Sequence, residues 1–171
     1  MKFFHMEADV FLLLGSDRGD RQAMLAAALS LLEERAGPVL VVSSVYETAP
    51  WGMDDEVPFL NQVAGLHTRL SPPELLEVIQ NIERELGRQR EKERGAGYHP
   101  RTLDIDILLW GDRVIRDGRL EVPHPRLGRR RFALVPLAEV AAERVHPVTG
   151  ITVAAMLERC DDDGWVRKIS G

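Results

Sequence analysis

The sequence predicts an α+β fold in which helices pack on an antiparallel sheet, and three observations lead to this prediction. Its 171 residues favour one domain, over residues 1–171, that is long enough to bury a substantial core. Hydrophobic residues make up 44% of the chain, which is typical of a globular protein and argues against extensive disorder. Strand-like and helix-like segments follow one another in the order β-α-β-β-α-β, and a mixed C-terminal tail comes after them.

Turn and cap residues divide the first half of the chain into its elements. Gly15-Ser16 ends an initial apolar run, Asp20 is a candidate N-cap, and Gly37-Pro38 would stop the helix that follows. A run rich in β-branched residues and its antiparallel partner flank a loop that contains proline and glycine. The predicted elements are strands over residues 10–14, 39–48 and 59–68, a helix over residues 20–35, and a loop over residues 49–58.

The second half begins with a capping box, Ser71-Pro72-Pro73-Glu74, which opens a helix predicted to end at Gly87. A polar loop over residues 88–100 leads to a strand that contains Asp104 and Asp106. The remaining predicted elements are short strands at 114–115 and 120–122, helical pieces after 123, and a helix over 152–159. This order indicates a ferredoxin-like βαββαβ sandwich with helices on one face of the sheet.

Charge and cysteine content argue against several classes of function. The net charge of −5 disfavours a general nucleic-acid binder, and the apolar runs are far too short for a membrane span. The N-terminus lacks the long apolar segment of a signal peptide, and Cys160, the only cysteine, excludes an intrachain disulfide. We therefore expect a cytoplasmic monomer that acts on small molecules, without nucleic-acid or membrane partners.

Positive charge is nevertheless clustered, and almost all of it comes from arginine. One cluster lies over residues 88–101, and a second comprises Arg129, Arg130 and Arg131. Genome composition, or a thermally stable and ion-paired surface, would explain the overall excess equally well. The local clusters fit a small polyanionic ligand better than a solvated face, because the guanidinium fork binds phosphate well.

The strongest candidate site is the pair Asp104 and Asp106, which lies inside an otherwise apolar strand. Strand alternation places both carboxylates on one face, about 6.6 Å apart along the strand. The other face would carry Leu103, Ile105, Ile107 and Leu109. Neighbouring like charges destabilise each other, and magnesium ions bound to both carboxylates would remove that penalty. A solvent-facing sheet surface is the structural alternative.

Two further groups suggest a bound ligand. His124 lies between two prolines and is followed by arginines, so it is either a turn residue or part of a phosphate site. Trp51, Phe59 and Asn61 combine aromatic faces with an amide, which together suit a flat heterocycle. Core packing is the ordinary alternative for Phe59, whereas asparagine is uncommon in a strand. Phe132 could belong to a helical face or to a stacking wall.

Seven segments of the chain, taken in order, resemble a known family. They are Leu14-Gly15-Ser16, Ser43-Ser44-Val45-Tyr46-Glu47-Thr48-Ala49-Pro50-Trp51-Gly52, Phe59-Leu60-Asn61, Ile82-Glu83-Arg84-Glu85-Leu86-Gly87-Arg88, Pro100-Arg101-Thr102-Leu103-Asp104-Ile105-Asp106-Ile107-Leu108, Val122-Pro123-His124-Pro125-Arg126 and Arg130-Arg131-Phe132-Ala133-Leu134-Val135-Pro136-Leu137. Over about residues 10–145 the chain is similar to 6-hydroxymethyl-7,8-dihydropterin pyrophosphokinase, a family of folate biosynthesis.

The resemblance implies a reaction, a fold and a set of site residues. Such enzymes move the pyrophosphoryl group of ATP to the hydroxymethyl oxygen of the pterin and leave AMP, on a ferredoxin-like fold. The implied catalytic residues are Arg88, Arg101, Asp104 and Asp106, and the two aspartates would hold two Mg²⁺ ions. The implied ATP contacts are Glu83, Arg88, Arg90, Arg101, His124 and Arg130. The implied pterin contacts are Thr48, Trp51, Phe59, Asn61, Tyr98 and Phe132.

The chain departs from the family in its loops. The segment before Pro100-Arg101 is longer than the common form, and Tyr98 is the nearest aromatic where a tryptophan often precedes the Pro-Arg. Trp51 is bulkier than the leucine of some members, which bears on pocket shape. The loops over 49–58 and 88–100 are candidate lids that would exclude water. No carboxylate is clearly placed as a general base, so we favour a metal-assisted hydroxyl as the nucleophile.

Two other functions would use the same features. A metal-dependent nucleotidyl transferase or nuclease could use the aspartate pair, although it would usually need a further carboxylate and a broad basic surface. A non-enzymatic ferredoxin-like module could bind a small ligand beside a structural metal. Formation of AMP from ATP, Mg²⁺ and the reduced pterin would separate these alternatives from a pyrophosphokinase.

Overall fold

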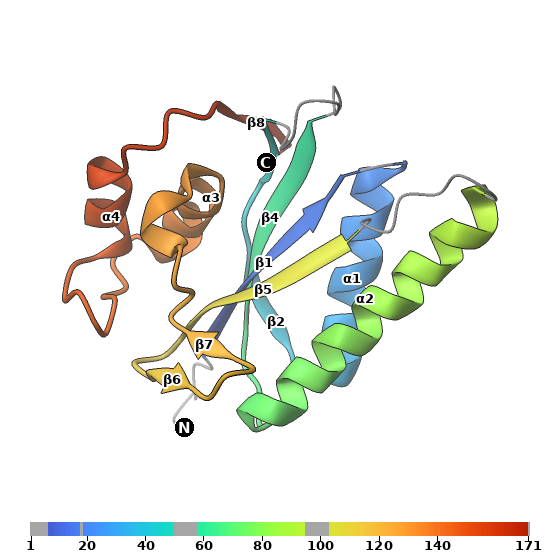
Figure 1. Cartoon of the computed structure of the whole chain (residues 1–171), viewed down its shortest axis with the longest axis horizontal. Helices are drawn as coiled ribbons and strands as arrows, with labels where there is room; N and C mark the ends of the chain where they lie inside the picture. The colour runs from blue at the N-terminus through green and yellow to red at the C-terminus, as the bar shows by residue number, and fades with distance from the viewer. Residues whose placement is uncertain (1–6, 18, 50–57, 95–102, 171) are drawn as a thin grey trace, which may run out of the picture.

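The computed structural model describes residues 7–17, 19–49, 58–94 and 103–170, with the backbone alone for residues 88–94 and Ser170. Within these residues the chain forms a six-stranded sheet in the order β5-β1-β4-β3-β8, and β2 also pairs with β4 (Figure 1). Every pairing in this sheet is antiparallel, which confirms the predicted fold class. The strands are β1 (Val10–Ser16), β2 (Val39–Val42), β3 (Val45–Thr48), β4 (Phe59–Leu66), β5 (Leu103–Trp110) and β8 (Val166–Ser170).

Helices cover both faces of the sheet, whereas the sequence predicted helices on one face. Figure 1 shows α1 and α2 on one side, and α3 and α4 on the other. Each pair of helices closes its own apolar cluster against the sheet. The helices are α1 (Arg21–Arg35), α2 (Pro72–Arg94), α3 (Arg131–Ala141) and α4 (Val153–Arg159). The C-terminal tail therefore supplies a second layer, because its apolar residues need the sheet face that α1 and α2 leave open.

Smaller elements connect β5 to α3. Strand β6 (Ile115–Arg116) pairs with β7 (Glu121–Val122) in a separate two-stranded ladder. A 3-10 turn, η1 (Leu127–Arg129), then leads into α3. The short strands expected near 114–115 and 120–122 are thus confirmed.

The capping signals in the sequence also act as predicted. The Asp20 carboxylate accepts a hydrogen bond from the Ala23 N–H at 3.0 Å, which satisfies one unpaired donor of the first turn of α1. At the start of α2, the Ser71 N–H donates to Glu74 at 2.9 Å, and the Glu74 N–H donates to the Ser71 hydroxyl at 3.4 Å. These two bonds form the expected capping box.

The predicted end of α2 at Gly87 is wrong, because the helix continues to Arg94. Residues 88–94, which form the last turns of this helix, were expected to begin the loop over 88–100. Glycine costs about 1 kcal/mol in a helix relative to alanine, but the arginines, glutamates, glutamine and lysine around it have high helix propensity. Their combined preference outweighs the one glycine.

The single strand predicted over residues 39–48 is divided in two. Strands β2 and β3 both pair with β4, and Ser43-Ser44 interrupts them. The Ser43 hydroxyl accepts from the Val63 N–H at 2.9 Å, so a side chain replaces part of the ladder at the break. The tail also forms a strand that the sequence did not predict, β8, which pairs with β3.

A bulge in β5 overturns the predicted position of Leu109. Leu12 of β1 pairs with Ile107, whereas Phe11 pairs with Leu109, so Leu108 is an extra residue in β5. Before the bulge, Ile107 packs towards α1 and α2, and after it Leu109 packs with Leu108 towards α3 and α4. Leu109 therefore does not share a face with Leu103, Ile105 and Ile107, because the bulge shifts the alternation by one residue.

No helix in the described part of the chain is both long and apolar enough to cross a membrane.

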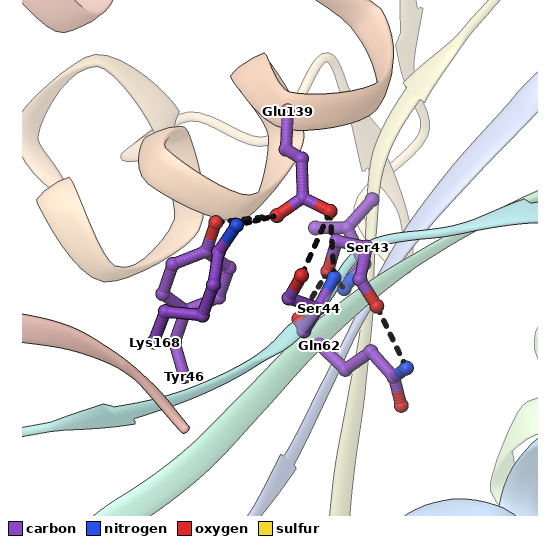
Figure 2. A network of polar contacts seen from close by, with 7 residues as sticks. Ser43, Ser44, Tyr46, Gln62, Glu139 and Lys168 are labelled. Atoms are coloured by element: carbon purple, nitrogen blue, oxygen red, sulfur yellow. Dashed lines mark hydrogen bonds and ion pairs between the residues drawn. The ribbon is translucent and has the colours of Figure 1, made fainter. Parts of the chain in front are cut away.

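A polar network joins α3 to the break between β2 and β3 (Figure 2). The Glu139 carboxylate accepts hydrogen bonds from the Ser44 N–H at 2.7 Å, the Ser44 hydroxyl at 3.1 Å and the Tyr46 hydroxyl. The Lys168 ammonium of β8 lies 3.8 Å from the same carboxylate. Burial alone would raise the pKa of Glu139, but the bonds from Tyr46 and Ser44 outweigh it and lower the pKa below its ordinary value. Burial and the bond to Glu139 raise the pKa of Tyr46 to about 12.

We predict that Glu139→Ala lowers the free energy of unfolding by about 1–2 kcal/mol, because several donors lose their shared acceptor. The folded-state pKa lies below the unfolded value of about 4.3, so this stabilisation is complete above that value and is lost as the pH falls through the lowered pKa. Denaturant unfolding at pH 7 and pH 3 measures the difference between wild type and variant. Exposed Glu143 provides the control, Glu143→Ala. Equal stability of the two variants at pH 7 would contradict the prediction.

Candidate active site

A cavity of about 440 Å³ opens on the sheet face that α3 and α4 cover. Its size is within the range of small-molecule sites. It is lined by Leu13, Gly15, Asp17, Thr48, Phe59, Asn61, Asp104, Asp106, His124, Arg126, Arg130 and Phe132. Eight of these residues are site residues predicted from the sequence, and they come from five separate segments of the chain.

Strand register brings the two aspartates of β5 to this cavity. Asp106 pairs with Leu13 and Asp104 pairs with Gly15, so both carboxylates lie on the cavity side of the sheet. Asp104 is exposed and Asp106 is half-buried. The alternation therefore places the pair as the sequence predicted, since the bulge comes only after Ile107.

The donor set of this pair fits Mg²⁺. Ionised carboxylates are hard, acceptor-only oxygen ligands, and Mg²⁺ binds through one or two of them and completes its shell with water and phosphate oxygens. In the part of the chain that the structure describes, no group of three or more His, Cys, Asp and Glu side chains is placed to hold a metal ion. The protein would thus supply Asp104 and Asp106 and leave the other positions to water and ligand.

Basic side chains line the same cavity close to Asp106. Burial lowers the pKa of His124; the negative charge of Asp106 opposes this shift, and the positive charges of Arg130 and Arg126 add to it. The His124 Nδ1 accepts a hydrogen bond from the Arg126 N–H at 3.1 Å. The neutral ring therefore carries its proton on Nε2 and presents a donor there.

Arg130 joins the carboxylate side of the cavity to its aromatic side. Burial lowers the pKa of its guanidinium, and the nearby Asp106 carboxylate opposes that shift, so the group remains charged at neutral pH. The same guanidinium lies 5.5 Å from the centre of the Phe132 ring. Its two neighbours in the arginine cluster, Arg129 and Arg131, do not line the cavity.

The opposite end of the cavity combines an amide with aromatic rings. Asn61 is buried, with 4% of its surface exposed, and its Nδ2 donates to the Thr48 hydroxyl at 2.8 Å. A Cβ at Gly15 would lie 3.1 Å from the Asn61 Oδ1, so only glycine leaves this amide undisturbed. With Phe59 and Phe132 on the same cavity, the amide has aromatic faces beside it. This arrangement suits the polar edge and the faces of a flat heterocycle.

Sequence reasoning missed three lining residues, Leu13, Gly15 and Asp17, whereas Arg126 is one of the arginines that follow His124. Asp17 lies directly after Gly15-Ser16, the predicted end of the first apolar run, and it is buried with 7% of its surface exposed. Leu13 and Gly15 alternate along β1, where they pair with Asp106 and Asp104, and Asp17 comes directly after the last residue of the strand. The period of two that identified the aspartate pair would have identified these residues as well.

Some predicted site residues lie elsewhere or outside the described residues. The Glu83 carboxylate accepts from the Ile105 N–H at 2.9 Å and so joins α2 to β5 away from the cavity lining. Arg88 and Arg90 belong to the last turns of α2, where only the backbone is described. Trp51, Tyr98 and Arg101 lie outside the described residues. The roles of all six stay predictions.

Comparison with known proteins identifies relatives that match most of this chain. The family model described as 7,8-dihydro-6-hydroxymethylpterin-pyrophosphokinase matches residues 11–142. A protein of Porphyromonas gingivalis named 2-amino-4-hydroxy-6-hydroxymethyldihydropteridine pyrophosphokinase is 47% identical, over 82% of this chain and 95% of its own length. A Bacillus subtilis protein of the same name is also 47% identical, over 78% of each chain.

Solved structures agree on the fold. A Plasmodium falciparum HPPK-DHPS triple mutant superposes with a TM-score of 0.71 at 18% sequence identity. The match covers 90% of this chain and 43% of that longer chain, so it supports the fold alone. The family model and the curated relatives carry the assignment: this chain is an enzyme that belongs to the 7,8-dihydro-6-hydroxymethylpterin-pyrophosphokinase family.

Proposed function

We propose that this enzyme transfers the pyrophosphoryl group of ATP to the hydroxymethyl group of 6-hydroxymethyl-7,8-dihydropterin, in a reaction that depends on Mg²⁺. The observation that carries the proposal is one continuous cavity with two chemically different ends. Asp104, Asp106, His124 and Arg130 form an end that suits a metal-bound polyphosphate. Thr48, Phe59, Asn61 and Phe132 form an end that suits a flat heterocycle with a polar edge.

The reaction needs little covalent participation by the protein. The hydroxymethyl oxygen bonds to the β-phosphorus of ATP, the bond from that phosphorus to the oxygen bridging to the α-phosphorus breaks, and AMP leaves. The hydroxyl proton is released to solvent or to a phosphate oxygen. Most of the rate in such transfers comes from alignment and from stabilising charge on the transferred group. A cavity that holds both substrates end to end provides the alignment.

Several side chains would stabilise the charge. Arg130 would donate to phosphate oxygens while its guanidinium stays next to the Phe132 ring. His124, neutral and with its proton on Nε2, would donate one further hydrogen bond without adding charge. Asp104 and Asp106 would hold two Mg²⁺ ions, which when bound neutralise the triphosphate and make the attacking hydroxyl more acidic.

Asn61 and Thr48 would select the heterocycle. One N–H of the Asn61 amide donates to the Thr48 hydroxyl, and this bond fixes the orientation of the amide. Its remaining donor and acceptor can then pair with complementary groups on a pterin ring edge. An analogue that lacks those groups would leave a buried amide unpaired, which costs about 1–3 kcal/mol.

The remaining parts of the proposal concern context. With a net charge of −5, the chain has no general attraction for nucleic acid, and its two substrates are small molecules. We propose that it acts in the cytoplasm as a monomer. Sedimentation at micromolar concentration tests the monomer.

The direct test of the function is incubation of the protein with ATP, Mg²⁺ and 6-hydroxymethyl-7,8-dihydropterin, followed by chromatography of the nucleotides. We expect AMP and the pterin diphosphate in equal amounts, and neither without the pterin or after Mg²⁺ is chelated. ADP as the product would overturn pyrophosphoryl transfer, and pterin binding without AMP would favour a binding module. Cleavage of a polynucleotide would favour a nuclease.

We predict that Asp106→Ala keeps the fold but lowers turnover at least about a thousandfold, which corresponds to roughly 4 kcal/mol of barrier. The reason is the loss of one of two carboxylates proposed to hold the metal. Steady-state AMP formation in saturating Mg²⁺ provides the measurement. Exposed Asp112, in the turn after β5, provides the matched control Asp112→Ala. Near-wild-type turnover of Asp106→Ala would remove this residue from the metal site.

Neighbouring arginines offer a second matched pair. Arg130→Ala should lower kcat/KM for ATP at least about a hundredfold, through a higher KM or a lower kcat, because a half-buried charged donor to phosphate is lost. Arg129 is exposed and does not line the cavity, so Arg129→Ala should stay within about threefold of wild type. If the two variants lose activity equally, general positive charge rather than the position of Arg130 matters.

A further inference from the structure

A second cavity, of about 110 Å³, adjoins the candidate active site and is lined largely by the C-terminal tail. It shares Thr48 and Phe132 with the larger cavity. Its other lining residues are Ala49, Asp162, Gly164, Trp165 and Val166. The four tail residues among these, Asp162, Gly164, Trp165 and Val166, lie beyond residue 142, where the family match ends. The match therefore assigns them no role.

Asp162 attaches the tail to the start of α3. Its Oδ2 accepts from the N–H of Arg131, the first residue of the helix, at 3.0 Å. The residue at the N-cap position, Arg130, makes no side-chain cap bond. Asp162 therefore supplies the acceptor that the first turn otherwise lacks, and its charge is favourable at the positive end of the helix dipole. Phe132 is the next residue along, so this bond holds the start of the helix from which its ring projects.

Trp165 attaches the tail to the other side of the proposed pterin compartment. Its carbonyl oxygen accepts from the Ala49 N–H at 3.3 Å, and the adjacent Val166 pairs with Thr48 in the β3–β8 ladder. The Arg167 guanidinium lies 5.6 Å from the centre of the Trp165 ring and also donates to Glu47 of β3 at 2.9 Å. The indole is thus held on one side while 44% of its surface stays exposed.

We propose that the tail segment 162–166 completes the pterin pocket: Asp162 is a positioning residue for Phe132, and Trp165 forms the outer wall of the compartment. The inference rests on the proposed function and extends it to residues outside the family match. A heterocycle held between Thr48 and Phe132 would meet the tail beyond them, because both residues face both cavities. The small cavity leaves room for a compact substituent on the ring, so the tail would set which pterins fit.

The test is a set of tail variants in the full-length chain. Asp162→Ala and Trp165→Ala should each raise the KM for the pterin at least about fivefold and leave the KM for ATP within about twofold. Asp162→Asn keeps one oxygen that can accept from the Arg131 N–H, but its amide nitrogen replaces the oxygen that accepts from the Gly164 N–H at 2.9 Å, so it should recover only part of the pterin affinity. Asp163 is exposed and lines neither cavity, which makes Asp163→Ala the matched control.

Equilibrium binding separates this inference from the proposed reaction. The Kd for the pterin is measured with saturating Mg²⁺ and α,β-methylene ATP, in which the bond to be broken is inert. A fivefold or greater rise for both variants supports the tail as part of the pocket, whether or not the wild type forms AMP. Unchanged pterin Kd in both variants overturns the tail inference while AMP formation by the wild type still stands. Equal losses of pterin and nucleotide affinity, with a lowered Tm, also overturn it, because they indicate general damage to the fold.

Discussion

The antiparallel pairing of β1 with two neighbours is the constraint on which the site depends. At Gly15, β1 pairs with Asn61 of β4 on one side and with Asp104 of β5 on the other. One backbone position therefore sets the spacing between the amide end and the carboxylate end of the cavity. An added Cβ at this position would lie 3.1 Å from the Asn61 Oδ1, so glycine leaves the amide in place where the two halves of the site join. A slip of one residue in either ladder would turn Asn61 or both aspartates to the opposite face.

The β5 strand has to satisfy two incompatible requirements, and the bulge reconciles them. Its first half faces the open cavity with carboxylates, whereas its second half must supply apolar contacts to α3 and α4. Strict alternation would continue to place every second residue, Leu109 included, towards α1 and α2. The extra residue Leu108 gives two consecutive leucines to the α3 and α4 side, so the core closes directly beyond the charged site.

The sequence could predict the features that depend on local residue pattern. It could not predict features that depend on a neighbouring strand or on the summed helix propensity of a longer segment. Capping at Asp20 and Ser71 and the shared face of Asp104 and Asp106 follow from spacing alone. The bulge at Leu108 depends on its register with β1, which no periodicity within β5 reveals. The prolongation of α2 through Gly87 depends on a balance of propensities that a single breaker residue obscured. The tail strand β8 exists because β3 offers it an open edge, and that edge is known only once the sheet is formed.

Helix α3 links stability to the site, because carboxylates hold it at both ends. Glu139, near its C-terminal end, anchors it to the break between β2 and β3, and Asp162 of the tail accepts from its first N–H. Arg130, at the N-cap position, and Phe132, the second residue of the helix, both line the cavity. A small tilt of the whole helix would move both side chains together, and the Glu139 anchor resists that tilt, whereas Asp162 acts on the first N–H and on the adjacent Phe132. Reactions that rely on alignment need this rigidity, since a displacement of about 1 Å can cost a hundredfold in rate.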